Sequence, residues 1–490
     1  MKKLSFIIVF VFLSILFVQA QQAKYVFYFI GDGMGVNQVL GTEMYRGELE
    51  GKIGVTPLLF TQFPYATIAT TFSATNGVTD SAAAGTALAT GNKTKNGALG
   101  VKKDLETKVN SVASWAKNKG CRVGISTSVS VDHATPAAFY AHQGQRSSYY
   151  NVGLDLIDAN FDFYAGSDFL DPTNKKAAGS NSESLYTLVD KAGYTIARGY
   201  KDYQKKAKKS DKLILLQPAT ATDNSAIPYA IDRKKGDMTL TEITRAGINF
   251  LSKDLSKGFF LMVEGGKIDW ACHSNDAATV FHEVMDMDNA IKVAYEFYEQ
   301  HPDETLIVVT ADHETGGIVL GKGPYTLNLQ ALKSQKVSES GYTKIVNELR
   351  KKYKNQVPWE VIKQSLKDNF GFWDSIQLNE KQEASLKKVY DESFSGKEID
   401  LTKSDYLPLL VALTANMMQT KSEYQQDEPL AAEAKRILDD IALVGWTSGG
   451  HSGGYVPVFA IGAGAQLFQG RIDNTEIPVK IAEAAGYPNN

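Results

Sequence analysis

The sequence predicts an α/β protein, a three-layer sandwich in which a central, mainly parallel sheet is flanked by helices. Apolar segments of strand length recur along the chain as continuous runs, which is typical of strands covered on both faces. One intervening segment has apolar residues on a single helical face, and strands that alternate with helices favour parallel pairing. The predicted strands are 25–30, 122–127, 258–263, 305–310 and 456–461, and the apolar helix face contains Val280, Val284, Met287, Ile291 and Ala294.

The first part of the chain has the pattern of a secretory signal peptide. Lys2 and Lys3 precede an apolar run from Leu4 to Val18, and Ala20 is a small residue at the expected cleavage position. This run is shorter than the roughly 18 residues that a membrane span needs. We therefore expect a signal peptide over 1–20 and a periplasmic or secreted mature protein without a membrane span.

Composition argues against two other classes of protein. The 490 residues include 52 Lys and Arg against 55 Asp and Glu, and the short basic segment 205–209 reads as a solvated surface. A nucleic-acid partner therefore has no support. Two cysteines, Cys121 and Cys272, are too few for a disulfide scaffold. The sequence leaves open whether these two cysteines pair.

The strand predicted at 25–30 ends at Asp32, which lies between two glycines. A carboxylate in this position is either a turn residue or a metal ligand that open backbone makes accessible. The segment by itself does not decide between the two.

The segment 79–91 places Asp80 and Ser81 directly before a run of small residues. This run is compatible with a short helix whose first turn contains Ser81. Unpaired N–H groups and the helix dipole favour an anion there, either an ionised serine oxygen or a phosphoryl oxygen. An ordinary helix cap explains the same residues when the segment is taken alone.

Polar residues also follow the later strands. Because ligands and catalytic groups of parallel sheets collect at the carboxyl ends of the strands, we expect these side chains to converge. Arg146 follows in what reads as a helix start, and His451 lies in the glycine-rich loop before the last strand. The other residues of this kind are His133, Thr135, Glu264, Asp269, His273, Asp312 and His313.

The pattern changes to helices joined by charged linkers between residues 321 and 444. We expect an α/β core over 21–320 and 445–490, with 321–444 as a mainly helical insertion that forms a cap or a dimer contact. No catalytic residue is predicted in this insertion. Its predicted helices are 344–353, 359–366, 383–394, 406–418 and 429–443.

The donor types suggest three metal sites. Imidazole with carboxylate suits zinc, and Asp269 and His273 are four residues apart, which places both on one face of a helix. Ligands that are all oxygen suit magnesium. The expected zinc sets are Asp269, His273 and His451 for one ion and Asp32, Asp312 and His313 for the other, and the magnesium set is Asp32, Thr135 and Glu264.

Such sites permit an in-line displacement at phosphorus. Two ions about 4 Å apart can activate an attacking oxygen and hold a leaving oxygen. The planar guanidinium of Arg146 can bind two phosphate oxygens at once. Ser81 is then the expected nucleophile, activated by zinc and forming a phosphoserine intermediate without a general-base histidine.

Six motifs in chain order resemble those of the alkaline phosphatase family: IGDGMG, TDSAAAGTA, HATPAA, EGGKIDWACH, TADHETGG and GGHSGG. The resemblance covers nearly the whole mature chain apart from 321–444. It implies that Ser81 is phosphorylated, that two zinc ions and one magnesium ion occupy the sets given above, and that Arg146 binds phosphate. It also implies a homodimer, and it places Asp80, His133 and Trp270 beside the substrate.

His133 and Trp270 occupy positions that vary within this family. Some bacterial members carry Asp and Lys there, whereas animal members carry two His. The absence of an acidic residue at 133 should weaken magnesium binding, and Trp270 removes a cation that could hold phosphate. We therefore expect weaker product binding and faster release than in a member with Asp and Lys.

The sequence thus predicts an exported, metal-dependent alkaline phosphatase that hydrolyses phosphate monoesters. The alternatives are a related phosphodiesterase or sulfatase on the same sheet, and a non-catalytic protein that binds metal or phosphate. Arg146 fits a dianionic terminal phosphate better than a diester. A pure metal binder would need neither Ser81 nor Arg146. The motifs do not identify the natural substrate.

Overall fold

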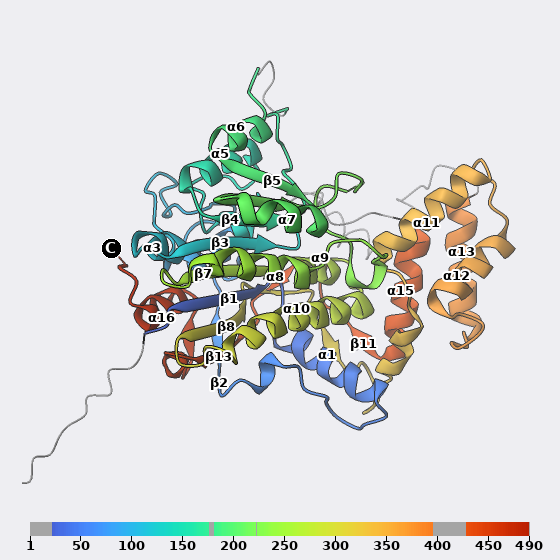
Figure 1. The fold of residues 1–490 in the computed structure, drawn as a ribbon. Helices are drawn as coiled ribbons and strands as arrows, with labels where there is room; N and C mark the ends of the chain where they lie inside the picture. Colours follow the sequence, from blue (N-terminus) through green and yellow to red (C-terminus); the bar gives the residue numbers. More distant parts are fainter. Residues whose placement is uncertain (1–21, 176–180, 222, 395–427, 490) are drawn as a thin grey trace, which may run out of the picture.

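The computed structural model describes residues 22–175, 181–221, 223–394 and 428–489, and its centre is a ten-stranded sheet (Figure 1). The strand order is β14-β2-β13-β8-β1-β7-β3-β4-β6-β5. All pairs are parallel except those of β13 (Val456–Gly462), which runs antiparallel to β2 (Tyr65–Thr70) and to β8 (Thr305–Ala311). The predicted fold class, a mainly parallel sheet flanked by helices, is confirmed.

The middle of the sheet consists of β1 (Tyr25–Gly31), which lies between β8 and β7 (Phe259–Gly265), with β3 (Arg122–Thr127) beyond β7. Every residue of β1, β7 and β8 is buried. The continuous apolar runs therefore correspond to strands covered on both faces. The five strands predicted from the sequence are confirmed at these positions and at β13.

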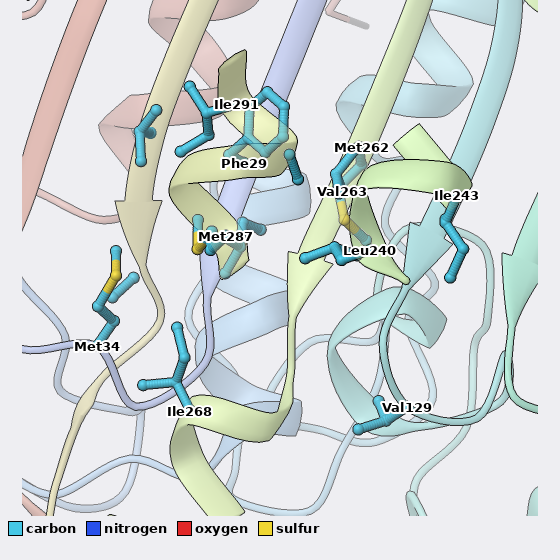
Figure 2. Packing of buried hydrophobic residues seen from close by; sticks show 14 of the residues in the cluster. Phe29, Met34, Val129, Leu240, Ile243, Met262, Val263, Ile268, Met287 and Ile291 are labelled. Atoms are coloured by element: carbon cyan, nitrogen blue, oxygen red, sulfur yellow. The ribbon is translucent and has the colours of Figure 1, made fainter. Parts of the chain in front are cut away.

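Helices cover both faces of the sheet. Phe29 of β1 packs with Met287 and Ile291 of α10 (Ala277–Tyr298) on one face (Figure 2), where α10 also contacts α8 (Leu240–Leu251) and α1 (Val36–Leu49). The neighbouring Tyr28 points to the other face and donates a hydrogen bond from its hydroxyl to Leu88 of α2 (Ser81–Thr90). The helices α3 (Val112–Asn118) and α16 (Glu476–Ala485) contact α2 on that side.

The remaining strands complete the two ends of the sheet, and the sequence did not predict them. β4 (Phe163–Gly166), β6 (Lys212–Leu216) and β5 (Tyr194–Arg198) extend it beyond β3, and β14 (Ile472–Asp473) pairs with β2 at the other end. In the chain, α5 (Tyr149–Ala159) precedes β4, α6 (Leu185–Lys191) lies between β4 and β5, and α7 (Tyr200–Lys206) lies between β5 and β6.

Two short antiparallel ribbons lie outside the main sheet. β9 (Glu314–Thr315) pairs with β12 (His451–Ser452), and β10 (Val319–Leu320) pairs with β11 (Val444–Gly445). The second ribbon joins the start and the end of the helical segment. That segment therefore leaves the sheet and returns to it at adjacent positions.

The helical segment contains α11 (Glu339–Lys352), α12 (Trp359–Phe370), α13 (Glu380–Phe394) and α15 (Pro429–Ala442), which extend to the right of the sheet in Figure 1. Four of the five predicted helices are thus confirmed. The helix predicted at 406–418 and the signal peptide predicted at 1–20 lie outside the described residues. Among the residues that the structure describes, no helix combines the length and the apolar character of a membrane span.

Candidate active site

The predicted functional residues meet at the carboxyl edge of the central strands. The register places Gly31 beside both Gly265 and Ala311, so Asp32, Glu264 and Asp312 come from adjacent strand ends. All three side chains are fully buried. Three groups have ligand atoms within 4.8 Å of one another: Asp269, His273 and His451; Asp32, Asp312 and His313; and Asp32, His133 and Glu264.

The first group is built on α9 (Lys267–His273), which begins directly after β7. Its i,i+4 spacing brings His273 Nε2 to 3.3 Å from Asp269 Oδ2, as predicted. His451, from the β12 strand, lies with its Nε2 3.6 Å from Asp269 Oδ1 and 3.2 Å from His273 Nε2. Three donor atoms from two distant parts of the chain therefore surround one point.

The outer ring nitrogens show which nitrogen of each histidine is available. His273 Nδ1 lies 2.6 Å from the carbonyl oxygen of Gly449, and His451 Nδ1 lies 2.8 Å from that of Thr79. A carbonyl only accepts, so both Nδ1 atoms carry the proton and both Nε2 atoms present lone pairs. Two facing lone pairs do not bond each other, whereas a cation between them satisfies both. This donor set fits zinc.

The second group surrounds His313, whose Nε2 lies 3.4 Å from Asp32 Oδ1 and 3.3 Å from Asp312 Oδ2. Both oxygens of Asp32, Oδ2 of Asp312 and Oε1 of Glu264 accept no hydrogen bond from any described residue. Buried carboxylate oxygens without donors are costly unless a cation is present. The residues here therefore also fit divalent ions.

Electrostatics leads to the same conclusion. Burial, followed by repulsion from neighbouring carboxylates, raises the pKa of Asp32 and of Asp312 well above the usual range. Burial raises the pKa of Glu264 to about 7, although the neighbouring hydroxyls of Thr127 and Thr135 act to lower it. The Thr135 hydroxyl is buried near Glu264 and has no hydrogen-bond partner among the described residues. This concentration of negative charge is stable only with protons or cations.

Asp269 behaves differently from the other carboxylates of the site. Burial acts to raise its pKa, but the adjacent imidazoles, His273 first, outweigh burial and hold the pKa below the usual range. The surroundings of Asp269 therefore favour its ionised form.

Ser81 is the first residue of α2, and Asp80 caps this helix by accepting a hydrogen bond from Ala83 N at 3.0 Å. The serine side chain is buried, and its Oγ lies 3.3 Å from His313 Nε2. Every other residue of α2 is buried as well, so the run of small residues lets the helix pack closely beneath the site. The predicted position of Ser81 at a helix start is confirmed, and the residue lies beside His313, one of the expected metal ligands.

Arg146 completes the arrangement around Ser81, although the helix start predicted there is wrong. The residue lies in a turn before α5, because its backbone N–H is bound by the Gly97 carbonyl at 2.7 Å. Its guanidinium lies 3.4 Å from Asp80 Oδ2 and 3.2 Å from His133 Nε2. The His133 ring in turn lies 6.0 Å from the ring of Trp270, measured between centroids. All the residues predicted to contact substrate are therefore neighbours.

Sequence reasoning missed the residues that support these groups. The Thr315 hydroxyl donates to Asp269 Oδ1 at 2.6 Å, and Gln38 Nε2 donates to Glu314 Oε1 at 2.7 Å. Both Glu314 and Thr315 lie inside the motif TADHETGG, so their position next to ligands was a usable signal. Cys272 is buried and unpaired, as is Cys121, and burial raises the pKa of the Cys272 thiol well above its usual value.

This fold and this donor set define the class: a metal-dependent hydrolase with its site at the carboxyl edge of an α/β sheet. The family model for alkaline phosphatase matches residues 23–159 and 171–487. The chain belongs to the alkaline phosphatase family, and its reaction is the hydrolysis of phosphate monoesters.

Individual relatives agree with this assignment. The chain is 31% identical to alkaline phosphatase 3 of Bacillus subtilis over 479 residues, which cover 95% of this chain and 90% of the relative. It resembles the solved structure of a cold-active alkaline phosphatase from Shewanella sp. with a TM-score of 0.74 and 29% identity, covering 94% of this chain and 99% of that one. The alkaline phosphatase of the Antarctic bacterium TAB5 gives a TM-score of 0.63 at 26% identity, covering 96% and 100%.

Proposed function

We propose that this phosphomonoesterase works through a phosphoserine formed on Ser81. The observation that carries the proposal is the position of Ser81 Oγ, at the N-terminus of a ten-residue helix and 3.3 Å from His313 Nε2. The N-terminal end of a helix favours the negative charge of the reacting groups. The buried small residues of α2 keep this end of the helix in place.

The residues that would hold metal ions are the three sets predicted from the sequence. Asp269, His273 and His451 would hold one zinc ion, and Asp32, Asp312 and His313 the other. When bound, the two ions would supply positive charge that lowers the pKa of an attacking oxygen and stabilises a leaving one.

The third ion is proposed to be magnesium, held by Asp32, Thr135 and Glu264. The all-oxygen donors support this choice. A histidine-to-aspartate variant of the TAB5 enzyme, 26% identical to this chain with a TM-score of 0.64, is described with Mg bound in its M3 site. That description supports magnesium in a site of this family.

The side chains of this protein then account for two successive displacements. Arg146, oriented by Asp80 and by the Gly97 carbonyl, binds two nonbridging phosphate oxygens. Ser81 Oγ forms a bond to phosphorus while the ester oxygen departs with the alcohol, and water then cleaves the phosphoserine to release phosphate. Two in-line steps give overall retention of configuration at phosphorus.

We also propose that the protein is exported, homodimeric and divided as the sequence predicts. The signal-peptide pattern of residues 1–20 supports a periplasmic or secreted location. The pairing of β10 with β11 supports a core of 21–320 and 445–490 that carries 321–444 as an insertion. The homodimer rests on the usual state of the family.

The test is steady-state hydrolysis of p-nitrophenyl phosphate beside bis-p-nitrophenyl phosphate. We expect strong monoesterase activity in the wild type, and loss of at least about three orders of magnitude in Ser81→Ala, as is found when a nucleophile is removed. EDTA should abolish activity, and zinc with magnesium should restore it. Ser111→Ala is the matched control, because Ser111 is likewise a buried serine at the N-terminal end of a helix, α3, but does not belong to the site.

Three outcomes would contradict the proposal. A preference for the diester would indicate a phosphodiesterase, and inactivity after zinc restoration would indicate a protein that only binds metal or phosphate. Ser81→Ala with wild-type turnover would refute the phosphoserine.

A further inference from the structure

Thr315 lies between the two predicted zinc sets. It belongs to β9, pairs with His451 in the β9–β12 ribbon, and is fully buried. Its Oγ1 is 2.6 Å from Asp269 Oδ1, in one set, and 3.2 Å from His313 Nδ1, in the other. One hydroxyl group therefore contacts ligands of both sets.

The direction of both hydrogen bonds follows from the donor and acceptor types. A carboxylate that binds metal only accepts hydrogen bonds, so the single hydroxyl proton of Thr315 is donated to Asp269. The hydroxyl oxygen is then an acceptor for His313, which requires the proton of the ring on Nδ1. The lone pair of His313 consequently lies on Nε2, the atom that faces Asp32, Asp312 and Ser81.

His313 differs in this respect from the other two histidines of the predicted zinc sets, His273 and His451. The Nδ1 atoms of His273 and His451 are bound by backbone carbonyls, which no substitution of their residues removes. The Nδ1 atom of His313 depends on a side chain. Of these three histidines, His313 is therefore the one whose ring orientation can be changed by substituting the residue that binds its Nδ1 atom.

The surroundings hold the Thr315 hydroxyl in this place. Gly33, with φ of +70°, packs against it so closely that an added Cβ atom would lie 2.9 Å from Thr315 Oγ1 and 2.9 Å from Asp269 Cα. Gly33 N also donates to Asp312 Oδ1 at 3.1 Å. A backbone in direct contact leaves the hydroxyl little freedom to rotate away.

We propose that Thr315 is a positioning residue that couples the two zinc sets, fixing the tautomer of His313 and the orientation of Asp269 through one hydroxyl. The inference rests on the proposed metal binding and goes beyond it, since it assigns a role to a residue that does not itself bind metal. Partners of this kind typically change metal affinity by about 10–100-fold.

The test measures zinc affinity by competition with a chelator, independently of activity. Thr315→Val keeps the shape of the side chain and removes the hydroxyl, so we expect both zinc affinities to fall by about 10–100-fold. Thr315→Ser keeps the hydroxyl and should restore them. Thr244→Val is the matched control, because Thr244 is equally buried but donates only to Leu240 O within α8.

A second measurement needs no variant. The chain has seven histidines, so isotope-edited NMR of the imidazole rings can resolve them individually in the zinc-loaded wild type. We expect a protected Nδ1–H for His313, held by the Thr315 hydroxyl oxygen. Absence of this proton from wild-type His313 would overturn the inference, even if Thr315→Val failed to fold.

The outcomes separate this inference from the proposed function. Unchanged zinc affinity in folded Thr315→Val, or weakening of one site alone, would overturn the coupling while wild-type zinc binding and Ser81-dependent activity stand. A wild-type protein that binds no zinc would remove the proposed function itself, and the coupling with it.

Discussion

His133 and Trp270 show how single residues can set the affinity for phosphate. The His133 ring lies against Arg146, and burial, with the Arg146 charge as a further cause, lowers its pKa to about 3. His133 is therefore neutral throughout the physiological range, and the indole of Trp270 has no charge at any pH. Neither side chain adds positive charge beside the phosphate that Arg146 would bind.

Trp270→Lys should strengthen product inhibition. A lysine at this position would place an ammonium group near the phosphate oxygens, and one charge-assisted hydrogen bond contributes about 1.5–3 kcal/mol. We expect the inhibition constant for inorganic phosphate to fall by at least about tenfold. Trp270→Leu removes the ring without adding charge and is the control. An equal or higher constant in Trp270→Lys would contradict the role given to this position.

His133→Asp should raise the affinity for magnesium. His133 groups with Asp32 and Glu264 within 4.8 Å, and a carboxylate oxygen suits magnesium better than an imidazole nitrogen. Titration calorimetry with magnesium, at saturating zinc, should show a lower Kd than in the wild type. His133→Asn supplies an oxygen without the charge, so a similar gain in that variant would assign the effect to donor type rather than charge.

At the residue scale the sequence could locate the candidate ligands more readily than the residues that support them. Asp32, Glu264 and Asp312 lie at the ends of apolar runs, so the strand pattern indicates where these residues meet. Thr315 and Gln38 act through contacts between segments far apart in the chain, and no periodicity reports such contacts. Threonines and glutamines occur in many turns, so the sequence does not distinguish the ones that support the site from the ones that do not.

Among the elements, the β9–β12 ribbon is the one on which the geometry of the site depends most, because it brings His451 to the site. Glu314 binds Gln38 of α1 and also accepts from the Ser452 hydroxyl, which ties the ribbon to the core. Directly after β9, Gly316 has φ of +86° and packs against the Trp446 ring. Trp446 is itself fixed by a 2.7 Å hydrogen bond to Asp439 of α15.

Gly316→Ala should destabilise the protein and weaken zinc binding together. An added Cβ atom would lie 2.6 Å from Trp446 Cε3, so overpacking would add about 1–3 kcal/mol to the cost of the left-handed backbone. Gly236→Ala is the control, since Gly236 has φ of +103° but open space around it. Urea unfolding should show a larger loss for Gly316→Ala, and zinc affinity should fall in that variant alone. Equal losses of stability in the two variants would exclude packing against Trp446 as the cause.

The elements that the sequence predicted are the ones with the strongest patterns. β1, β7 and β8 are buried on both faces and read as apolar runs, whereas β2 alternates between partly buried and exposed positions and β14 has two residues. The helix start expected at Arg146 was wrong because a contact with Gly97, almost fifty residues away in the chain, holds that segment as a turn. Long-range contacts of this kind override local preference.

For the molecule as a whole, repulsion among the buried carboxylates of the site destabilises the fold, and bound metal ions can offset this repulsion. Four carboxylates meet in the buried centre of the carboxyl edge. Ions that bind only the folded state stabilise it, by about 4 kcal/mol at a thousandfold excess over Kd. We therefore expect the stability of the protein to depend on its metals as strongly as its activity does.

Removal of metal should lower Tm, and more so as the pH rises. The Glu264 pKa is about 7 in the metal-free fold against a usual 4.5. Between these values the unfolded chain has lost this proton and the fold still holds it, so metal-free stability falls with rising pH. Thermal unfolding of EDTA-treated and restored protein should give a difference in Tm that widens across this window. A Tm difference that does not change with pH would contradict the effect assigned to the Glu264 carboxylate.

The β9–β12 pair also has a consequence for biogenesis. Protein synthesis proceeds from the N-terminus, so Asp32, Ser81 and Asp269 leave the ribosome well before His451 does. The ribbon that seats His451 can form only when this late segment meets Glu314 and Thr315. In a nascent chain the group of Asp32, Asp312 and His313 is therefore made first, and the group of Asp269, His273 and His451 can be completed only after the helical segment has been synthesised.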